Sequence, residues 1–250
     1  MRNIFSAFKT EKKAIAFIDY EYCFYSYMDT HKIKPCPMIW KKMIEEEYEL
    51  SEIMVFGDFA QKEIGEELRK LRSITNTIIE TSNVFLERKK DMTDFIMLDY
   101  IYQSVETRKD VDTYILFTGD GHFQSVVKYL RQRKKNVIIC GVRETMSNQL
   151  RSVASEILEL PIEEERDINY YRLIASNMNY VEQFPKIVPT FMRTVENVAK
   201  KNNLPEDLVT DVLRRMIQKG YITKKVKKMS NGDVRYLEAC WDKMIEDGIC

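Results

Sequence analysis

The stretch Leu116-Phe-Thr-Gly-Asp-Gly-His-Phe123 (LFTGDGHF) decides the fold class of the first part of the chain. An apolar run ends abruptly in Gly119-Asp120-Gly121, and a helical pattern begins directly after it. Two glycines around a carboxylate let the backbone turn sharply and leave room for a ligand. The pattern predicts a buried strand that ends in a turn where functional side chains could lie.

Short apolar runs alternate with amphipathic stretches on both sides of this turn, from residue 14 to residue 160. Strands are predicted over 14–18, 53–56, 76–80, 114–118 and 137–140, with a last apolar patch at 157–160. Helices are predicted over 38–49, 61–71, 93–104, 123–133 and 147–154. Strands this apolar, separated by helices, indicate a parallel sheet covered on both faces. We therefore expect an α/β three-layer sandwich.

The pattern changes after Pro161. The charged run 163–167 predicts a linker. Helices are then predicted over 170–178, 190–201 and 206–219, followed by strand-like runs at 221–228 and 234–239. Asn-Gly between the two runs is a strong hairpin signal, and helix, turn, helix, hairpin is the order of a winged helix. We expect a domain over 1–162 and a small C-terminal winged-helix domain over 168–250.

Composition excludes several classes of protein. Of the 250 residues, 44% are hydrophobic and 31% are charged, which is typical of a soluble globular protein. No apolar run reaches the ~18 residues of a membrane span, and the first residues lack the apolar core of a signal peptide. We therefore expect a cytoplasmic protein without membrane contact. Five scattered cysteines without a CxxC pair favour reduced thiols over a zinc finger or disulfide framework.

Two histidines, His31 and His122, exclude a His-rich metal site. Any metal is therefore expected on oxygen ligands, which favours magnesium or manganese.

Three predicted strands end in an acid, namely Asp19, Asp58 and Asp120. In an open parallel sheet, ligands bind beyond the carboxyl ends of the strands, where the strand order reverses. We expect the first strand and strand 114–118 to flank that reversal, which would bring Asp19 and Asp120 together. Asp94 opens a helix, where the helix dipole favours a carboxylate.

Crowded carboxylates remain ionised together only when a cation offsets their repulsion. This predicts a divalent metal, which could activate a water and stabilise charge on a phosphodiester. The alternative is that each aspartate merely caps the helix that follows it.

Three segments resemble the NYN family of PIN-like nucleases: AIAFIDYE (14–21), KKDMTDFIMLD (89–99) and the stretch 116–160 that begins LFTGDGHF. The resemblance covers roughly residues 12–160, and the third segment is the most specific. It implies a PIN-like fold, metal-dependent ribonuclease activity and an acidic cluster that binds magnesium or manganese.

Matched by position, the resemblance makes Asp19, Asp94 and Asp120 the candidate catalytic and metal-binding residues. Asp99 matches a second acidic position in the helix of Asp94. It lies five residues further on, about 140° around the helix, so both cannot point straight into one site. Asp99 therefore ranks lower.

The chain departs from the family pattern at three places. Tyr22 replaces an asparagine, His122 replaces an aspartate, and Ala154-Ser155 replaces Ala-Asp. The hydroxyl of Tyr22 can still reach the cleft, which makes it a candidate RNA contact. His122 is a candidate catalytic residue that binds the scissile phosphate as a cation or carries a proton; the alternative is a surface residue at a helix N-terminus.

These departures leave two hypotheses open. One is an active metal-dependent ribonuclease, and the other is a degenerate domain of the same fold that binds nucleic acid or protein. A phosphatase of another α/β family fits poorly, because Asp19-Tyr20-Glu21 lacks the second aspartate of a DxD nucleophile loop.

Basic side chains that could contact nucleic-acid phosphates fall in both parts of the chain. The candidates are Lys89, Lys90, Arg143, Arg214, Arg215, Lys224 and Lys225. The C-terminal module resembles the LOTUS-type domains that follow some NYN domains, so RNA is the expected partner and DNA or protein is an alternative there. A homodimer is compatible with a protein of this size.

Overall fold

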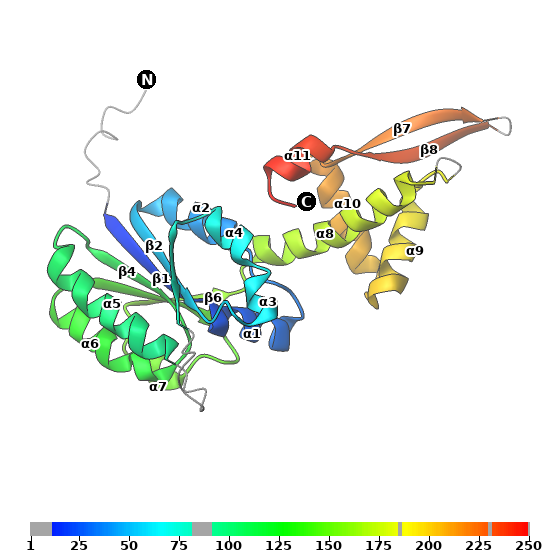
Figure 1. Cartoon of the computed structure of the whole chain (residues 1–250). Coiled ribbons are helices and arrows are strands. Elements are labelled where there is room, and N and C mark those ends of the chain that lie inside the picture. The colour runs from blue at the N-terminus through cyan, green and yellow to red at the C-terminus, as the bar shows by residue number, and fades with distance from the viewer. Residues whose placement is uncertain (1–11, 82–91, 185–186, 230–231, 250) are drawn as a thin grey trace, which may run out of the picture. The chain divides into compact units, whose positions relative to one another are not determined.

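The computed structural model describes residues 12–81, 92–184, 187–229 and 232–249. The chain divides into two compact units, one up to Ile162 and one from Glu163 onward. Figure 1 shows the elements of each unit. Among the described residues, no helix combines the length and the apolarity needed to cross a membrane.

The first unit is built on a six-stranded parallel sheet with the order β3-β2-β1-β4-β5-β6. Its strands are β1 (Lys13–Asp19), β2 (Glu49–Gly57), β3 (Thr77–Glu80), β4 (Thr113–Phe117), β5 (Asn136–Val142) and β6 (Glu156–Leu160). The predicted parallel sheet is confirmed, and the apolar patch at 157–160 is the edge strand β6.

Helices cover both faces of this sheet, as Figure 1 shows, so the expected three-layer α/β sandwich is confirmed. One face carries α1 (Tyr20–His31), α2 (Pro37–Glu47), α3 (Lys62–Gly65) and α4 (Leu68–Arg72). The other carries α5 (Thr93–Thr107), the 3₁₀ turn Gly121–Phe123, α6 (Gln124–Gln132) and α7 (Asn148–Arg151).

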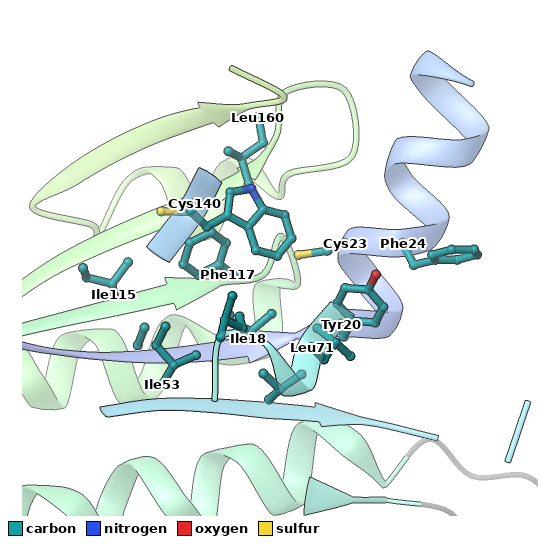
Figure 2. Packing of buried hydrophobic residues seen from close by; sticks show 14 of the residues in the cluster. Ile18, Tyr20, Cys23, Phe24, Ile53, Leu71, Ile115, Phe117, Cys140 and Leu160 are labelled. Carbon is teal, nitrogen blue, oxygen red and sulfur yellow. The ribbon is translucent and has the colours of Figure 1, made fainter. Parts of the chain in front are cut away.

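The central strand β1 explains why the sheet is buried on both faces. Its residues 14–18 are completely buried, and alternate side chains point to opposite faces of a strand. Ile18 joins the core on the α1 side, whereas Phe17 joins the core beneath α5. Figure 2 shows the first of these cores, where Ile18 and Phe117 lie on the same side of the sheet as Cys23 of α1.

The predicted helix 61–71 is wrong as a single element, because it forms two short helices, α3 and α4. A Cβ at Gly65 would lie 2.7 Å from the carbonyl oxygen of Phe59, so glycine permits a close backbone approach there. Glycine also weakens a helix by about 1 kcal/mol relative to alanine. Between the two helices, Glu67 is buried against Lys34 and Lys70.

The strand order reverses between β1 and β4, as expected for this sheet. Ile18 of β1 pairs with Phe117 of β4, so the carboxyl ends of the two strands lie side by side. Asp19 ends β1, and Asp120 follows β4 by three residues. This register places both aspartates at one edge of the sheet.

The second unit has its own core and elements. They are α8 (Glu163–Glu182), α9 (Phe191–Asn202), α10 (Glu206–Gln218), β7 (Ile222–Met229), β8 (Gly232–Ala239) and α11 (Trp241–Glu246). The antiparallel hairpin of β7 and β8 confirms the Asn-Gly signal.

The linker predicted over 163–167 is wrong, because these residues form the first turn of α8. Three glutamates stand at the start of this helix, where the helix dipole favours negative charge. Further along, Tyr171, Ile174 and Met178 bury one face in the core of the unit. The sequence therefore predicted only the middle of α8, at 170–178.

Candidate metal centre at the carboxyl edge of the sheet

An open cleft with a volume of about 320 Å³ lies at the carboxyl ends of β1 and β4. It is lined by Asp19, Glu21, Tyr22, Tyr25, Ser26, Asp29, Asp94, Asp120 and Thr145. Three of the predicted acids, Asp19, Asp94 and Asp120, come from separate segments and line this one cleft. The cleft is strongly acidic.

Asp19 has a structural function as well as a place in the cleft. It is the N-cap of α1, and its Oδ1 accepts a hydrogen bond from the backbone N–H of Tyr22 at 3.0 Å. Such a cap satisfies one of the N–H groups that a helix start leaves unpaired. The residue is only 6% exposed. Asp19 can therefore cap α1 and line the cleft at the same time.

Asp120 caps the 3₁₀ turn, because its Oδ1 accepts the backbone N–H of His122 at 2.8 Å. The imidazole of His122 turns back over this carboxylate, with Nδ1 3.1 Å from Asp120 Oδ1. The same Nδ1 lies 3.5 Å from Oδ2 of Asp94, in the first turn of α5. Asp94, Asp120 and His122 thus offer three ligand atoms that all lie within 4.8 Å of one another.

The two separations from His122 Nδ1 suit ligands of one divalent cation. Neighbouring ligands of an octahedral ion with bonds of roughly 2.1 Å are about 3 Å apart, close to the distances from His122 Nδ1 to the two carboxylates. Sequence reasoning placed any metal on oxygen ligands alone. In the structure, the imidazole nitrogen of His122 lies beside the two carboxylates, where it could act as a further ligand.

Glu21 is an acid of the cleft that the sequence analysis did not assign. Its Oε1 accepts hydrogen bonds from the backbone N–H of Asp58 at 2.5 Å and from Thr93 Oγ1 at 3.1 Å. Glu21 therefore ties the start of α1 to the end of β2 and to the residue before Asp94. The available signal was the Asp-x-Glu spacing directly after a buried strand, which places both acids at the same edge.

Tyr22 links α1 to the turns that follow β4 and β5. Its hydroxyl accepts the backbone N–H of Val142 at 3.0 Å and shares a hydrogen bond of 3.0 Å with Thr145 Oγ1. A Cβ at Gly119 would lie 2.2 Å from this hydroxyl, so glycine is required beside it. Burial raises the pKa of Tyr22 to about 12, and the phenol is therefore neutral at physiological pH.

The sequence profile of the NYN domain matches residues 13–161, well over half of the chain. The chain belongs to the NYN domain family. A crystal structure of a protein of unknown function from Vibrio parahaemolyticus RIMD 2210633 has a similar fold, with a TM-score of 0.54 and 18% sequence identity. The similarity covers 61% of this chain and 95% of that chain. No protein with a curated description matches this chain.

Among the described residues, two acids considered in the sequence analysis do not line the cleft of the NYN domain. Asp99 is exposed on α5 and accepts a hydrogen bond from Gln103 Nε2 at 2.7 Å. Asp58 accepts hydrogen bonds from Ala60 N–H and from Gln61 Nε2, both close to it in sequence.

Of the predicted basic RNA contacts in the NYN domain, the structure describes only Arg143. Arg143 is exposed, and its Nε lies 3.8 Å from Oε1 of Glu159. Lys89 and Lys90 lie outside the described residues.

In the second unit, each predicted basic contact has a neighbour within the unit. Arg214 pairs with Asp211 at 3.3 Å, and Arg215 pairs with Asp167 at 2.7 Å. Lys225 pairs with Glu238 at 2.7 Å, and Lys224 Nζ lies 5.6 Å from the ring centre of Phe191. Lys224 and Lys225 remain exposed on β7, whereas Arg215 is half-buried.

Proposed function

We propose that this NYN-domain protein is a metal-dependent nuclease that hydrolyses RNA phosphodiester bonds. The observation that supports it most is that Asp19, Asp94 and Asp120, from three separate segments, line one cleft at the strand-order reversal. Membership of the NYN family supports a nuclease fold. Magnesium and manganese are the proposed cofactors, because carboxylate oxygens are the ligands that both prefer.

Each cleft residue has a separate part in this proposal. Asp94 and Asp120 hold the ion, with Asp19 beside them on the end of β1. A bound divalent ion supplies an activated water and stabilises negative charge on the phosphate. His122, whose side chain is 78% exposed, stands at the edge of the cleft, where it can contact the scissile phosphate or carry a proton.

The position of His122 favours the alternative of a non-catalytic binding module. The imidazole of His122 lies close enough to Asp94 and Asp120 to form an ion pair with both when it is protonated. A protonated histidine would then offset the acids without a metal. In that case the domain would bind RNA or a protein partner and leave the RNA intact.

The second unit is proposed to be a winged-helix domain that recruits RNA, DNA or a protein partner. Its order of helices followed by an antiparallel hairpin supports this reading. Lys224 and Lys225 are exposed on the hairpin, where a wing would contact a nucleic-acid backbone. Arg214 and Arg215 are proposed contacts from α10. Lys89, Lys90 and Arg143 are proposed contacts from the NYN domain.

Cleavage of labelled RNA with added manganese tests the nuclease proposal. Asp19→Asn, Asp94→Asn and Asp120→Asn each keep the side-chain shape and remove a charge from the cleft. We expect each to lower the cleavage rate on the order of 100-fold or more, because metal ions contribute several kcal/mol to such reactions. Asp99→Asn is the matched control, since it removes an equal charge from an exposed site on the helix of Asp94.

The same experiment separates the two hypotheses. Manganese-dependent cleavage that survives in Asp99→Asn but not in the cleft variants supports the nuclease. RNA that stays intact with the wild-type protein, while still binding to it, supports the binding module.

A further inference from the structure

We propose that His122 is a metal ligand that makes the NYN cleft prefer a transition-metal ion such as Mn²⁺ over Mg²⁺. The inference rests on the proposed function, because it requires that the cleft hold a divalent ion. It adds the chemical class of that ion and assigns the selectivity to a single side chain.

The backbone holds His122 next to the two acids. Its N–H donates to Asp120 Oδ1 at 2.8 Å, so the 3₁₀ turn fixes the residue directly beside that carboxylate. The following residue, Phe123, is completely buried in the core beneath α5. The turn is therefore anchored on both sides of His122, while its exposed imidazole remains accessible to ions from solvent.

The ring nitrogen that faces the acids is Nδ1. It lies 3.1 Å from Asp120 Oδ1 and 3.5 Å from Asp94 Oδ2. These separations are close to the roughly 3 Å between neighbouring ligands of one octahedral ion, and they also match an ion pair in the metal-free protein. In both cases Nδ1 points at the place where the two carboxylates converge.

The chemistry of the donor set determines which ion it favours. Mg²⁺ binds oxygen ligands at near-ideal octahedral geometry. Mn²⁺ also binds carboxylate oxygens, but as a first-row transition metal it accepts an imidazole nitrogen more readily than Mg²⁺ does. With a histidine at this position, the site has one negative charge fewer than it would have with an aspartate. Mg²⁺ gains little from a nitrogen ligand, so this exchange weakens Mg²⁺ more than Mn²⁺. An aspartate at position 122 should restore the oxygen-only set.

Pulsed EPR of Mn²⁺ bound to the 250-residue chain tests this assignment directly. Protein labelled with ¹⁵N-histidine should show a ¹⁵N hyperfine coupling to the bound ion. The chain has one other histidine, His31, whose Nε2 lies 3.6 Å from Oε2 of Glu144. We expect the coupling to persist in His31→Asn and to vanish in His122→Asp. Circular dichroism checks that the exposed His122→Asp substitution leaves the fold intact.

Displacement of Mn²⁺ by Mg²⁺ gives the second measurement. We expect His122→Asp to lower the ratio of Mn²⁺ to Mg²⁺ affinity roughly tenfold or more, since changes around a metal commonly alter affinity by that amount. Bound Mn²⁺ without histidine coupling, or an unchanged ratio in His122→Asp, overturns the inference and leaves the proposed nuclease standing. If the wild-type protein does not bind Mn²⁺ more tightly than Asp120→Asn does, both the inference about His122 and the nuclease proposal are overturned.

Discussion

At the scale of single residues, the cleft depends on how Tyr22 packs beside Gly119. The phenol hydroxyl occupies the space that a side chain at position 119 would need, and it also accepts the backbone N–H of Val142. One tyrosine thus holds the turns after β4 and β5 close to the start of α1. Asp19 and Asp120 lie on two of these connected segments.

The close packing of Tyr22 against Gly119 can be tested by substitution. We expect Gly119→Ala to destabilise the protein by roughly 1–3 kcal/mol, because the new methyl group overpacks a filled space. In a Tyr22→Ala background the same substitution should cost much less. Urea unfolding of the wild-type protein, the two single variants and the double variant forms a double-mutant cycle. This cycle measures the coupling free energy between positions 22 and 119. Additive effects of the two substitutions would contradict the packing described.

Glu67 predicts a pH dependence of stability. Burial alone would raise the pKa of this carboxyl, but hydrogen bonds from Lys34 and Lys70 outweigh burial and lower it below its ordinary value of 4.5. A lowered pKa in the folded state adds stability above the unfolded pKa, and this stability is lost as the pH falls through the folded pKa.

Glu67→Gln should therefore reduce the free energy of unfolding by roughly 1–3 kcal/mol at pH 7, because it removes the negative charge and one of the two oxygens that accept hydrogen bonds from lysines. The difference from the wild-type protein should shrink below about pH 4.5. Urea unfolding at pH 7 and at pH 3.5 measures it, with the exposed neighbour Glu66→Gln as the control. An equal difference at both pH values would argue against the lowered pKa.

At the scale of secondary-structure elements, α1 begins on a residue that also lines the cleft. Asparagine caps helices as well as aspartate does, whereas alanine does not. We expect Asp19→Ala to be less stable than Asp19→Asn by about 0.5–2 kcal/mol, while both lose RNA cleavage. Thermal unfolding and cleavage assays of the two variants separate the structural function from the chemical one. Activity retained in Asp19→Asn would show that Asp19 only caps the helix.

The sheet and the pair Asp19 and Asp120 could be predicted because each depends on a local pattern. A continuous apolar run such as 14–18 indicates a strand buried on both faces, and parallel strands bring their carboxyl ends to one edge. The break between α3 and α4 could not be predicted, since it depends on tertiary contacts at Gly65 and Glu67. The start of α8 was missed because its glutamates have the composition of a solvated linker.

The candidate site was less predictable than the fold. A nitrogen ligand at His122 depends on the side chain turning back over Asp120, which no spacing in the sequence specifies. The hydrogen bonds of Glu21 join segments that are 37 and 72 residues away in the sequence. Contacts of this kind are set by the assembled sheet and not by local pattern.

At the scale of the whole molecule, each unit has a hydrophobic core of its own. We expect fragments 1–162 and 163–250 to unfold cooperatively when expressed separately, because each buries its core without the other. The first fragment should retain manganese-dependent cleavage. Thermal unfolding followed by circular dichroism tests both fragments. A fragment that unfolds without cooperativity would contradict the division.

The central claim is that Asp94 and Asp120 hold a divalent ion in a cleft that Asp19 also lines. Anomalous diffraction at the manganese edge, from crystals grown with Mn²⁺, tests it most directly. We predict a single strong peak in the cleft, roughly 2.0–2.3 Å from carboxylate oxygens of Asp94 and Asp120. A cleft without anomalous density at saturating Mn²⁺, or side chains of Asp19, Asp94 and Asp120 that point into separate regions of solvent, would contradict the claim.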